Sequence, residues 1–155
     1  MKVIFLDFNG VLDTYENMVQ INEYNLKRLK HIVDKTQAKI VISSSLKNSY
    51  YHTGHFSVHL KNIIQEIENT GIEIIGITPY LGNREEEIKL YLKQHPEIDS
   101  YCILDDDYEM EDLKENLVKL PPQMQMGQSG LEDIHVDMAI KILSRKNNIK
   151  SLFEN

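Results

Sequence analysis

The sequence feature that most constrains the fold is a repeated alternation of short apolar runs with longer segments of helical periodicity. The runs VIFL (residues 3–6), KIVI (39–42) and YCIL (101–104) are short and almost entirely apolar, as is typical of strands buried on both faces. Between them lie segments with apolar side chains every three or four residues, which is the spacing of an amphipathic helix. Because strands that alternate with helices pair in parallel, this pattern predicts an α/β fold.

The predicted architecture is a doubly wound parallel sheet with helices on both faces. In the helix expected at 22–34, Leu26, Leu29 and Ile32 share one face, and Gly71 suits the end of the helix expected at 59–69. The expected strands are residues 3–6, 39–42, 72–77, 101–104 and 118–120, and the expected helices are residues 22–34, 59–69, 84–94 and 131–143.

Length, charge and cysteine content limit the classes of protein to which the chain can belong. Its 155 residues fit one domain spanning 1–155. A net charge of −7 argues against broad affinity for nucleic acid or anionic membranes, although a local basic pocket is compatible with it. Cys102 is the only cysteine, the N-terminus lacks a signal-peptide pattern, and no apolar stretch approaches the ~20 residues of a membrane span. We therefore expect a soluble, cytoplasmic protein.

Polar residues stand at the ends of three of the expected strands. Asp7, Ser43 and Asp105 each directly follow an apolar run. The carboxyl ends of parallel strands meet at one edge of the sheet, which is where open α/β sheets bind ligands. We therefore expect these three residues to lie together on that edge.

Carboxylates at that edge indicate phosphoryl chemistry assisted by a divalent cation. Asp7 and the run Asp105–Asp107 would repel one another, and Mg²⁺, which prefers carboxylates, water and phosphate oxygens, would relieve that repulsion. A carboxylate can also act as a nucleophile toward phosphorus. The charge of a bound phosphate needs a positive side chain as well, and Arg84 and Lys47 are both candidates.

Each of these residues also has a purely structural interpretation. Asp7 alone is typical of a turn or helix cap, Ser43–Ser45 of a polar loop, Asp105–Asp107 of a solvated acidic turn, and Arg84 of an exposed first helical turn. Independent turns, however, have no reason to place a nucleophile, a hydroxyl, a cation and an acidic cluster at successive strand–helix junctions. The ordered set therefore favours a functional site.

Four motifs in this order give the chain a resemblance to a known family. They are FLDFNGVLDT, KIVISSS, NREEEI and YCILDDD, and together they cover nearly the whole chain. The sequence resembles the haloacid dehalogenase (HAD) superfamily of phosphotransferases, with a Rossmann-like sheet. The segments SSSLK, IIGITP and ILDDD are most similar to a small-cap branch, whose HAD domains are like those of Swiss-army-knife RNA-repair proteins.

The resemblance implies a nucleophile and a metal site. Asp7 would be the nucleophile and also a metal ligand, and Asn9 would offer its backbone carbonyl to Mg²⁺ from the place of the family's general acid/base. Asp105 and Asp106 would hold the metal directly or through water, whereas the resemblance assigns Asp107 no definite role.

The resemblance also implies a set of contacts to the phosphate. Ser43 would hydrogen-bond the phosphoryl group, with Ser44 as the alternative if the strand ends one residue later. Arg84 would be the positive clamp, and Lys47 would replace it or contact the substrate. Gly10 would let the backbone turn closely around the phosphate.

Asn9 departs from the family pattern, because the family's phosphatases carry aspartate at this position. An amide cannot exchange a proton with the leaving group, and such proton transfer typically contributes ~10²–10⁴-fold to the rate. We therefore expect a Mg²⁺-dependent phosphatase acting through an aspartyl-phosphate, impaired as written, either because Asn9 was introduced to trap a ligand or because it is natural. The alternative is a phosphate-binding or interaction module, while a dehalogenase is disfavoured because it would not need the acids at 105 and 106.

The segment LKNSYYHTGHFS (residues 46–57) is the candidate for a short cap or substrate loop. Its aromatic residues Tyr50, Tyr51 and Phe56 either stack on a nucleobase or pack on the following helix. A small or absent cap suits a nucleotide, another phosphorylated small molecule or the phosphorylated end of a nucleic acid as substrate. Asp13 is expected at the entrance to the site, and PPQMQMGQSG (121–130) is expected to be a mobile loop.

Overall fold

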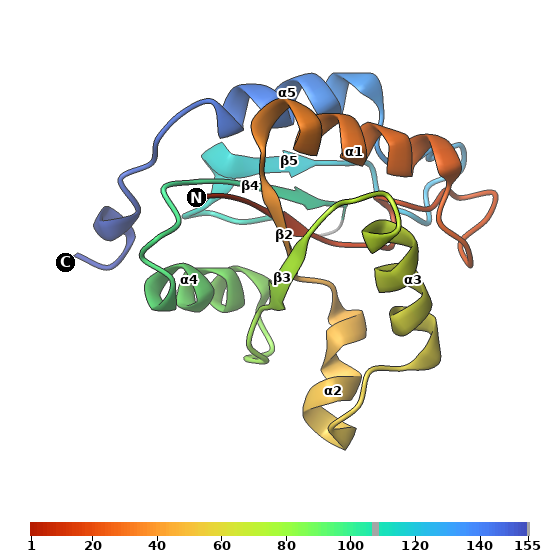
Figure 1. The fold of residues 1–155 in the computed structure, drawn as a ribbon, viewed down its shortest axis with the longest axis horizontal. Helices are drawn as coiled ribbons and strands as arrows, with labels where there is room; N and C mark the ends of the chain where they lie inside the picture. Colours follow the sequence, from red (N-terminus) through yellow and green to blue (C-terminus); the bar gives the residue numbers. More distant parts are fainter. Residues whose placement is uncertain (107–108, 155) are drawn as a thin grey trace.

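The computed structural model describes residues 1–106 and 109–154, which contain a five-stranded parallel sheet in the order β3-β2-β1-β4-β5 (Figure 1). The strands are β1 (Lys2–Leu6), β2 (Lys39–Ile42), β3 (Ile74–Ile77), β4 (Ser100–Asp105) and β5 (Leu117–Lys119). The order confirms a doubly wound, Rossmann-like sheet. Because the chain moves outward from β1 to β3 and then returns to place β4 on the other side of β1, the topological switch point lies between β1 and β4.

Helices cover both faces of this sheet, with α1 and α5 on one side and α4 on the other (Figure 1). The α-helices are α1 (Glu23–Thr36), α2 (Asn48–Thr53), α3 (Val58–Glu68), α4 (Arg84–Gln94) and α5 (Asp133–Leu143). Short 3-10 helices occupy Ser45–Lys47, Lys114–Asn116 and Ile149–Leu152.

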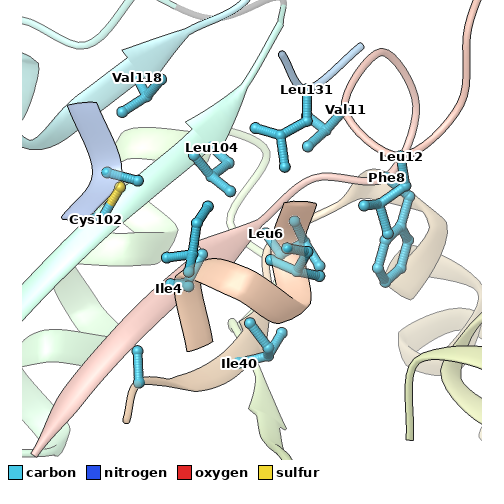
Figure 2. Close-up of a cluster of buried hydrophobic side chains, with 14 of the residues drawn as sticks. Ile4, Leu6, Phe8, Val11, Leu12, Ile40, Cys102, Leu104, Val118 and Leu131 are labelled. Carbon is cyan, nitrogen blue, oxygen red and sulfur yellow. The ribbon is translucent and has the colours of Figure 1, made fainter. Parts of the chain in front are cut away.

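The period of two along β1 divides the core into two layers. Ile4 and Leu6 join the apolar cluster under α1, α3 and α5, whereas Val3 and Phe5 join the cluster under α4. Figure 2 shows Ile4 and Leu6 among the side chains of the first cluster. The odd-numbered side chains of β1 therefore point toward α4. Asp7, the next odd-numbered residue, is expected to point to the same side of the sheet.

Most expected elements are found at or near the predicted bounds, and the differences have local causes. The helix expected from Asn22 begins one residue later, because the Asn22 side chain accepts hydrogen bonds from two backbone N–H groups as its N-cap. The helix expected from Leu131 begins at Asp133, because Glu132 has an extended backbone (ψ 171°) and is the N-cap. The strand expected from Ile72 begins at Ile74, and its register against β2 shifts between the pairs Ile40–Ile74 and Val41–Gly76.

Two further differences concern the candidate site. Asp105 was expected to follow its strand, but it is the last residue of β4 and is fully buried. Helix α2 was not predicted, since its six residues are too few to show a helical period, and it ends at Gly54 with φ 80°. Among the described helices, none has the length and apolar character needed to cross a membrane.

Candidate active site

The register of the sheet brings the expected strand-end residues together. Leu6 pairs with Ile42 on one side and with Leu104 on the other, so the residues that follow them are neighbours. The Asp7 N–H donates to the Leu104 carbonyl at 3.0 Å, which extends this pairing one residue past β1. Asp7 and Asp105 therefore meet at the switch point.

Three acidic side chains form a buried cluster at this point. Each of Asp7, Asp105 and Asp106 offers a carboxylate oxygen, and these oxygens all lie within 4.8 Å of one another. Their exposed fractions are only 6, 0 and 5%. Asp107 lies outside the described residues, so its predicted place beside the cluster is not tested.

Arg84 supplies positive charge to this cluster from the first residue of α4. Its Nη1 atom lies 2.5 Å from Asp105 Oδ2 and 3.6 Å from Asp7 Oδ1. The Asn83 side chain caps the helix by accepting from the Glu86 N–H, which fixes where α4 begins. Arg84 is thus buried against the acids. The purely structural interpretation, in which Arg84 faces solvent, is therefore wrong.

Burial and mutual repulsion make full ionisation of the cluster unfavourable. Burial raises the pKa of Asp7 well above its ordinary value, and the neighbouring Asp105 raises it further, while Arg84 opposes the shift. Burial also raises the pKa of Asp106, against hydrogen bonds that favour its charged form. Oxygen-only donors of this kind fit a hard divalent cation such as Mg²⁺, whose charge would relieve the repulsion. Asp7, Asp105 and Asp106 are the side chains that would hold it.

Gly10 is required where the chain passes this cluster. Its φ is +82°, and a Cβ atom at this position would lie 2.0 Å from Asp106 Oδ2. Two buried side chains hold its peptide groups: the Gly10 N–H donates to Asp13 Oδ1 at 2.6 Å, and Gln128 Nε2 donates to the Gly10 carbonyl at 2.6 Å. The close approach of Gly10 is therefore to a carboxylate of the cluster.

A second hydrogen-bonded link fixes Asp106 from the segment after β5. The Gln123 N–H donates to Asp106 Oδ2 at 2.7 Å, and Gln123 Nε2 donates to Asp13 Oδ2 at 2.6 Å. Asp13 was expected at the entrance, but it is buried behind the motif, where burial raises its pKa to about 6. Sequence reasoning missed the roles of Gln123 and Gln128, because nothing local distinguishes them from other polar residues of a loop.

The serine run after β2 divides into three different environments. Ser43 is fully buried, and its hydroxyl oxygen has no hydrogen-bond partner among the residues that the structure describes. Ser44 accepts from the Leu46 N–H and caps the following 3-10 helix, so its side chain has a structural contact. Ser45, which was not among the predicted site residues, lines the cavity.

Lys47 does not contact the acidic cluster in this structure. Its Nζ atom lies 3.0 Å from Glu87 Oε1, and both side chains are buried. The other Glu87 oxygen accepts from the N–H groups of Leu81 and Gly82. Of the two cations predicted to face a phosphate, Arg84 is therefore the one beside Asp7, and Lys47 ties the segment after β2 to the loop before α4.

A cavity of about 310 Å³ opens onto the cluster, which is enough room for a phosphate group with part of its ester. The predicted residues Asp7, Asn9, Arg84 and Asp106 contribute to its wall. The rest of its lining is Ser45, Pro122, Gln123 and Met124. The segment at 121–130, expected to be a mobile loop, thus supplies part of the cavity wall, and its Gln128 is buried and hydrogen-bonded.

Comparison with known proteins matches most of the chain to a protein family. Residues 3–133 match the family described as the HAD domain in Swiss Army Knife RNA repair proteins. No curated protein and no solved structure matched the chain. Because the match covers most of the chain, and includes every residue of the acidic cluster and Arg84, the protein belongs to this family of HAD domains.

Proposed function

We propose that the protein is a Mg²⁺-dependent phosphohydrolase that cleaves phosphate monoesters through an aspartyl-phosphate on Asp7. The observation that carries the proposal is the position of Asp7, buried at the switch point between the acids of β4 and the Arg84 guanidinium, at the base of a cavity. A divalent cation would supply charge neutralisation between the nucleophile and an anionic phosphate. Nucleotides and the terminal phosphates of nucleic acids are the substrates that we propose.

The chemistry can be assigned to residues of the chain in two steps. In the first, an Asp7 oxygen forms a bond to phosphorus, the ester P–O bond breaks, and the leaving oxygen takes a proton. In the second, water attacks the aspartyl-phosphate, which releases inorganic phosphate and restores Asp7. Arg84 favours the charged carboxylate of Asp7. The Ser43 hydroxyl, which has no hydrogen-bond partner within residues 1–106 and 109–154, is the candidate donor to a phosphoryl oxygen.

Asn9 determines how fast these steps run. It lines the cavity, where the proposed mechanism needs a group that gives a proton to the leaving oxygen and takes one from water. An amide does neither, so water must serve in its place and turnover is slow. Whether Asn9 is natural or introduced does not alter this expectation for the chain as it stands.

The Asn9→Asp variant tests the proposal. We expect it to hydrolyse members of a phosphomonoester panel ~10²–10⁴-fold faster than the unsubstituted chain, and only with Mg²⁺ present. Asp7→Asn in the Asn9→Asp background is the matched control, and it should abolish phosphate release. Hydrolysis that persists without Asp7 would contradict a nucleophilic role for this residue.

The second candidate function is a phosphate-binding or interaction module, and the observation that favours it is Asn9 itself. Isothermal titration with a non-hydrolysable phosphate analogue, with and without Mg²⁺, distinguishes the two. A module would bind the analogue, yet its Asn9→Asp variant would release no phosphate from any member of the panel. For either function we propose a cytoplasmic location, in keeping with the single buried Cys102.

A further inference from the structure

The strongest feature outside the site is an exposed group of rings, which we call the aromatic surface. It consists of Tyr50, Tyr51 and His52 on α2 and Tyr80 in the loop before α4. The three tyrosines remain 42–44% exposed. The rings of Tyr51 and Tyr80 lie nearly parallel, with centroids 6.2 Å apart, and the rings of His52 and Tyr80 are 5.3 Å apart.

The exposure of these rings bears on whether the aromatic residues of 46–57 pack on the following helix or are free to stack on a nucleobase. Phe56 does pack against the core cluster that includes α3, as the structural interpretation required. Tyr50 packs on both Phe56 and Tyr51, with ring centroids 5.1 and 5.5 Å apart, yet Tyr50 and Tyr51 keep much of their surface open to solvent. Exposed tyrosines grouped in this way offer flat faces on which another ring can stack.

The aromatic surface is continuous with the candidate active site. Ser45, which lines the cavity, begins the 3-10 helix that leads into α2, and Tyr80 precedes Arg84 by four residues in the chain. Figure 1 shows α2 beside the loop that enters α4. The Tyr51 hydroxyl donates to the Thr78 carbonyl at 2.8 Å, which holds the two segments together. A ligand with its phosphate in the cavity can therefore extend over these rings.

The charge of this part of the chain suits an anionic ligand. All 24 acidic residues lie outside residues 35–65, a stretch that carries four lysines and three histidines, of which Lys47 is buried and does not face a ligand on the surface. Glu87, which approaches the same region, is paired with Lys47. The net charge of −7 opposes broad affinity for nucleic acid, so a stretch free of acidic residues is where a polyanion would be repelled least.

We propose that the aromatic surface stacks the base next to the phosphorylated end of a single-stranded nucleic acid. The inference rests on the proposed function, because it takes the cavity to hold the terminal phosphate. Stacking on tyrosine tolerates any base, so the surface selects phosphates that carry a base over those that do not, with little preference for sequence.

Fluorescence anisotropy with a short single-stranded oligonucleotide that carries one terminal phosphate tests this inference without needing turnover. Tyr80→Leu keeps an apolar side chain but removes the ring, and we expect it to weaken binding about 5- to 100-fold. Tyr80→Phe keeps the ring and should bind like the unsubstituted chain. Tyr24→Leu is the matched control, because Tyr24 is 67% exposed on α1, and it should leave binding unchanged.

A second oligonucleotide, abasic at its phosphorylated end, separates stacking from other effects of the substitution. Tyr80→Leu should not change its already weaker binding. The inference would be overturned if Tyr80→Leu weakened binding of the two oligonucleotides equally, or weakened binding of neither. The second result is what a surface that docks a protein would give.

The outcome is distinguishable from failure of the proposed function. An Asn9→Asp protein that releases no phosphate from any ester would reject the phosphohydrolase, whereas Tyr80-dependent binding would still support the stacking surface. Glycerol phosphate hydrolysis by Asn9→Asp should be the same with Tyr80 or Leu at position 80, since this ester has no base. A large loss there would show that the substitution disturbs the cavity, and it would overturn the inference.

Discussion

Replacing Gly10 by alanine tests how closely the backbone and the acidic cluster fit together. The new Cβ atom would lie 2.0 Å from Asp106 Oδ2 and 2.3 Å from Asp106 Cγ, so the carboxylate must move. Moving it breaks the 2.7 Å hydrogen bond from the Gln123 N–H. The backbone cannot retreat instead, because Asp13 and Gln128 hold the N–H and the carbonyl of Gly10 at 2.6 Å each.

Gly54 provides a matched control for the backbone cost of this substitution. Its φ is +80°, nearly that of Gly10, but a Cβ atom there would meet nothing within 4 Å. Gly54→Ala should therefore cost only the ~1–2 kcal/mol of placing an L-residue in the left-handed region. Gly10→Ala adds the loss of a hydrogen bond to a charged group, so we expect about 3–5 kcal/mol in total.

The assay is urea unfolding of both variants and the unsubstituted chain, with and without Mg²⁺. An ion bound only by the folded state adds about 2.7 kcal/mol at a concentration 100 times its Kd. Gly54→Ala should keep this gain, whereas Gly10→Ala should lose much of it because Asp106 is displaced. If the two variants are equally stable and bind Mg²⁺ equally well, the reasoning about the contact between Gly10 and Asp106 is wrong.

Three further expectations concern buried charges. Arg84→Gln leaves two buried carboxylates without their cation, so it should lower the free energy of unfolding by about 3–5 kcal/mol, and Mg²⁺ should recover part of the loss in the same urea titration. Lys47→Met should be destabilising by a similar ~3–5 kcal/mol, and Lys47→Met combined with Glu87→Gln should restore stability, since no unpaired charge then remains buried. Asp13 has its folded pKa raised from 3.8 to about 6, so its contribution to stability is present below pH ~4 and is lost as the pH rises through 6. Over that range, Asp13→Asn should gain up to about 3 kcal/mol relative to the unsubstituted chain in unfolding measurements at each pH.

The central strands and the positions of the acids could be predicted because their signals are local. A run of four or five apolar residues shows where a buried strand lies, and its last residue fixes which side chain reaches the edge of the sheet. The alternation of side chains along β1 also predicts the side of the sheet to which Asp7 points, which is the side of Phe5 and α4. Arg84, at the first residue of α4, was predictable for the same reason.

The support around the acids could not be predicted, because it depends on contacts between distant residues. Gln128 reaches the Gly10 carbonyl across 118 positions of the chain, and Gln123 reaches Asp13 across 110. These residues lie in a segment with no hydrophobic period, so sequence reasoning treated it as a mobile loop. The pairing of Lys47 with Glu87 was not predictable either, since the two residues lie 40 positions apart, and a contact between Lys47 and the substrate stays a prediction.

Asn9 bears on the balance of charge as well as on proton transfer. Three buried carboxylates already form a cluster here, two of them beside the Arg84 guanidinium, and an aspartate at position 9 would line the same cavity with a further acid. Under the proposed function, the amide would avoid that repulsion toward a phosphate dianion, and the site would lack the proton donor that an aspartate supplies. Binding of phosphate and its turnover should therefore change in opposite directions when Asn9 becomes aspartate. A phosphohydrolase would trade affinity for rate at this residue, whereas a binding module would lose affinity and gain nothing.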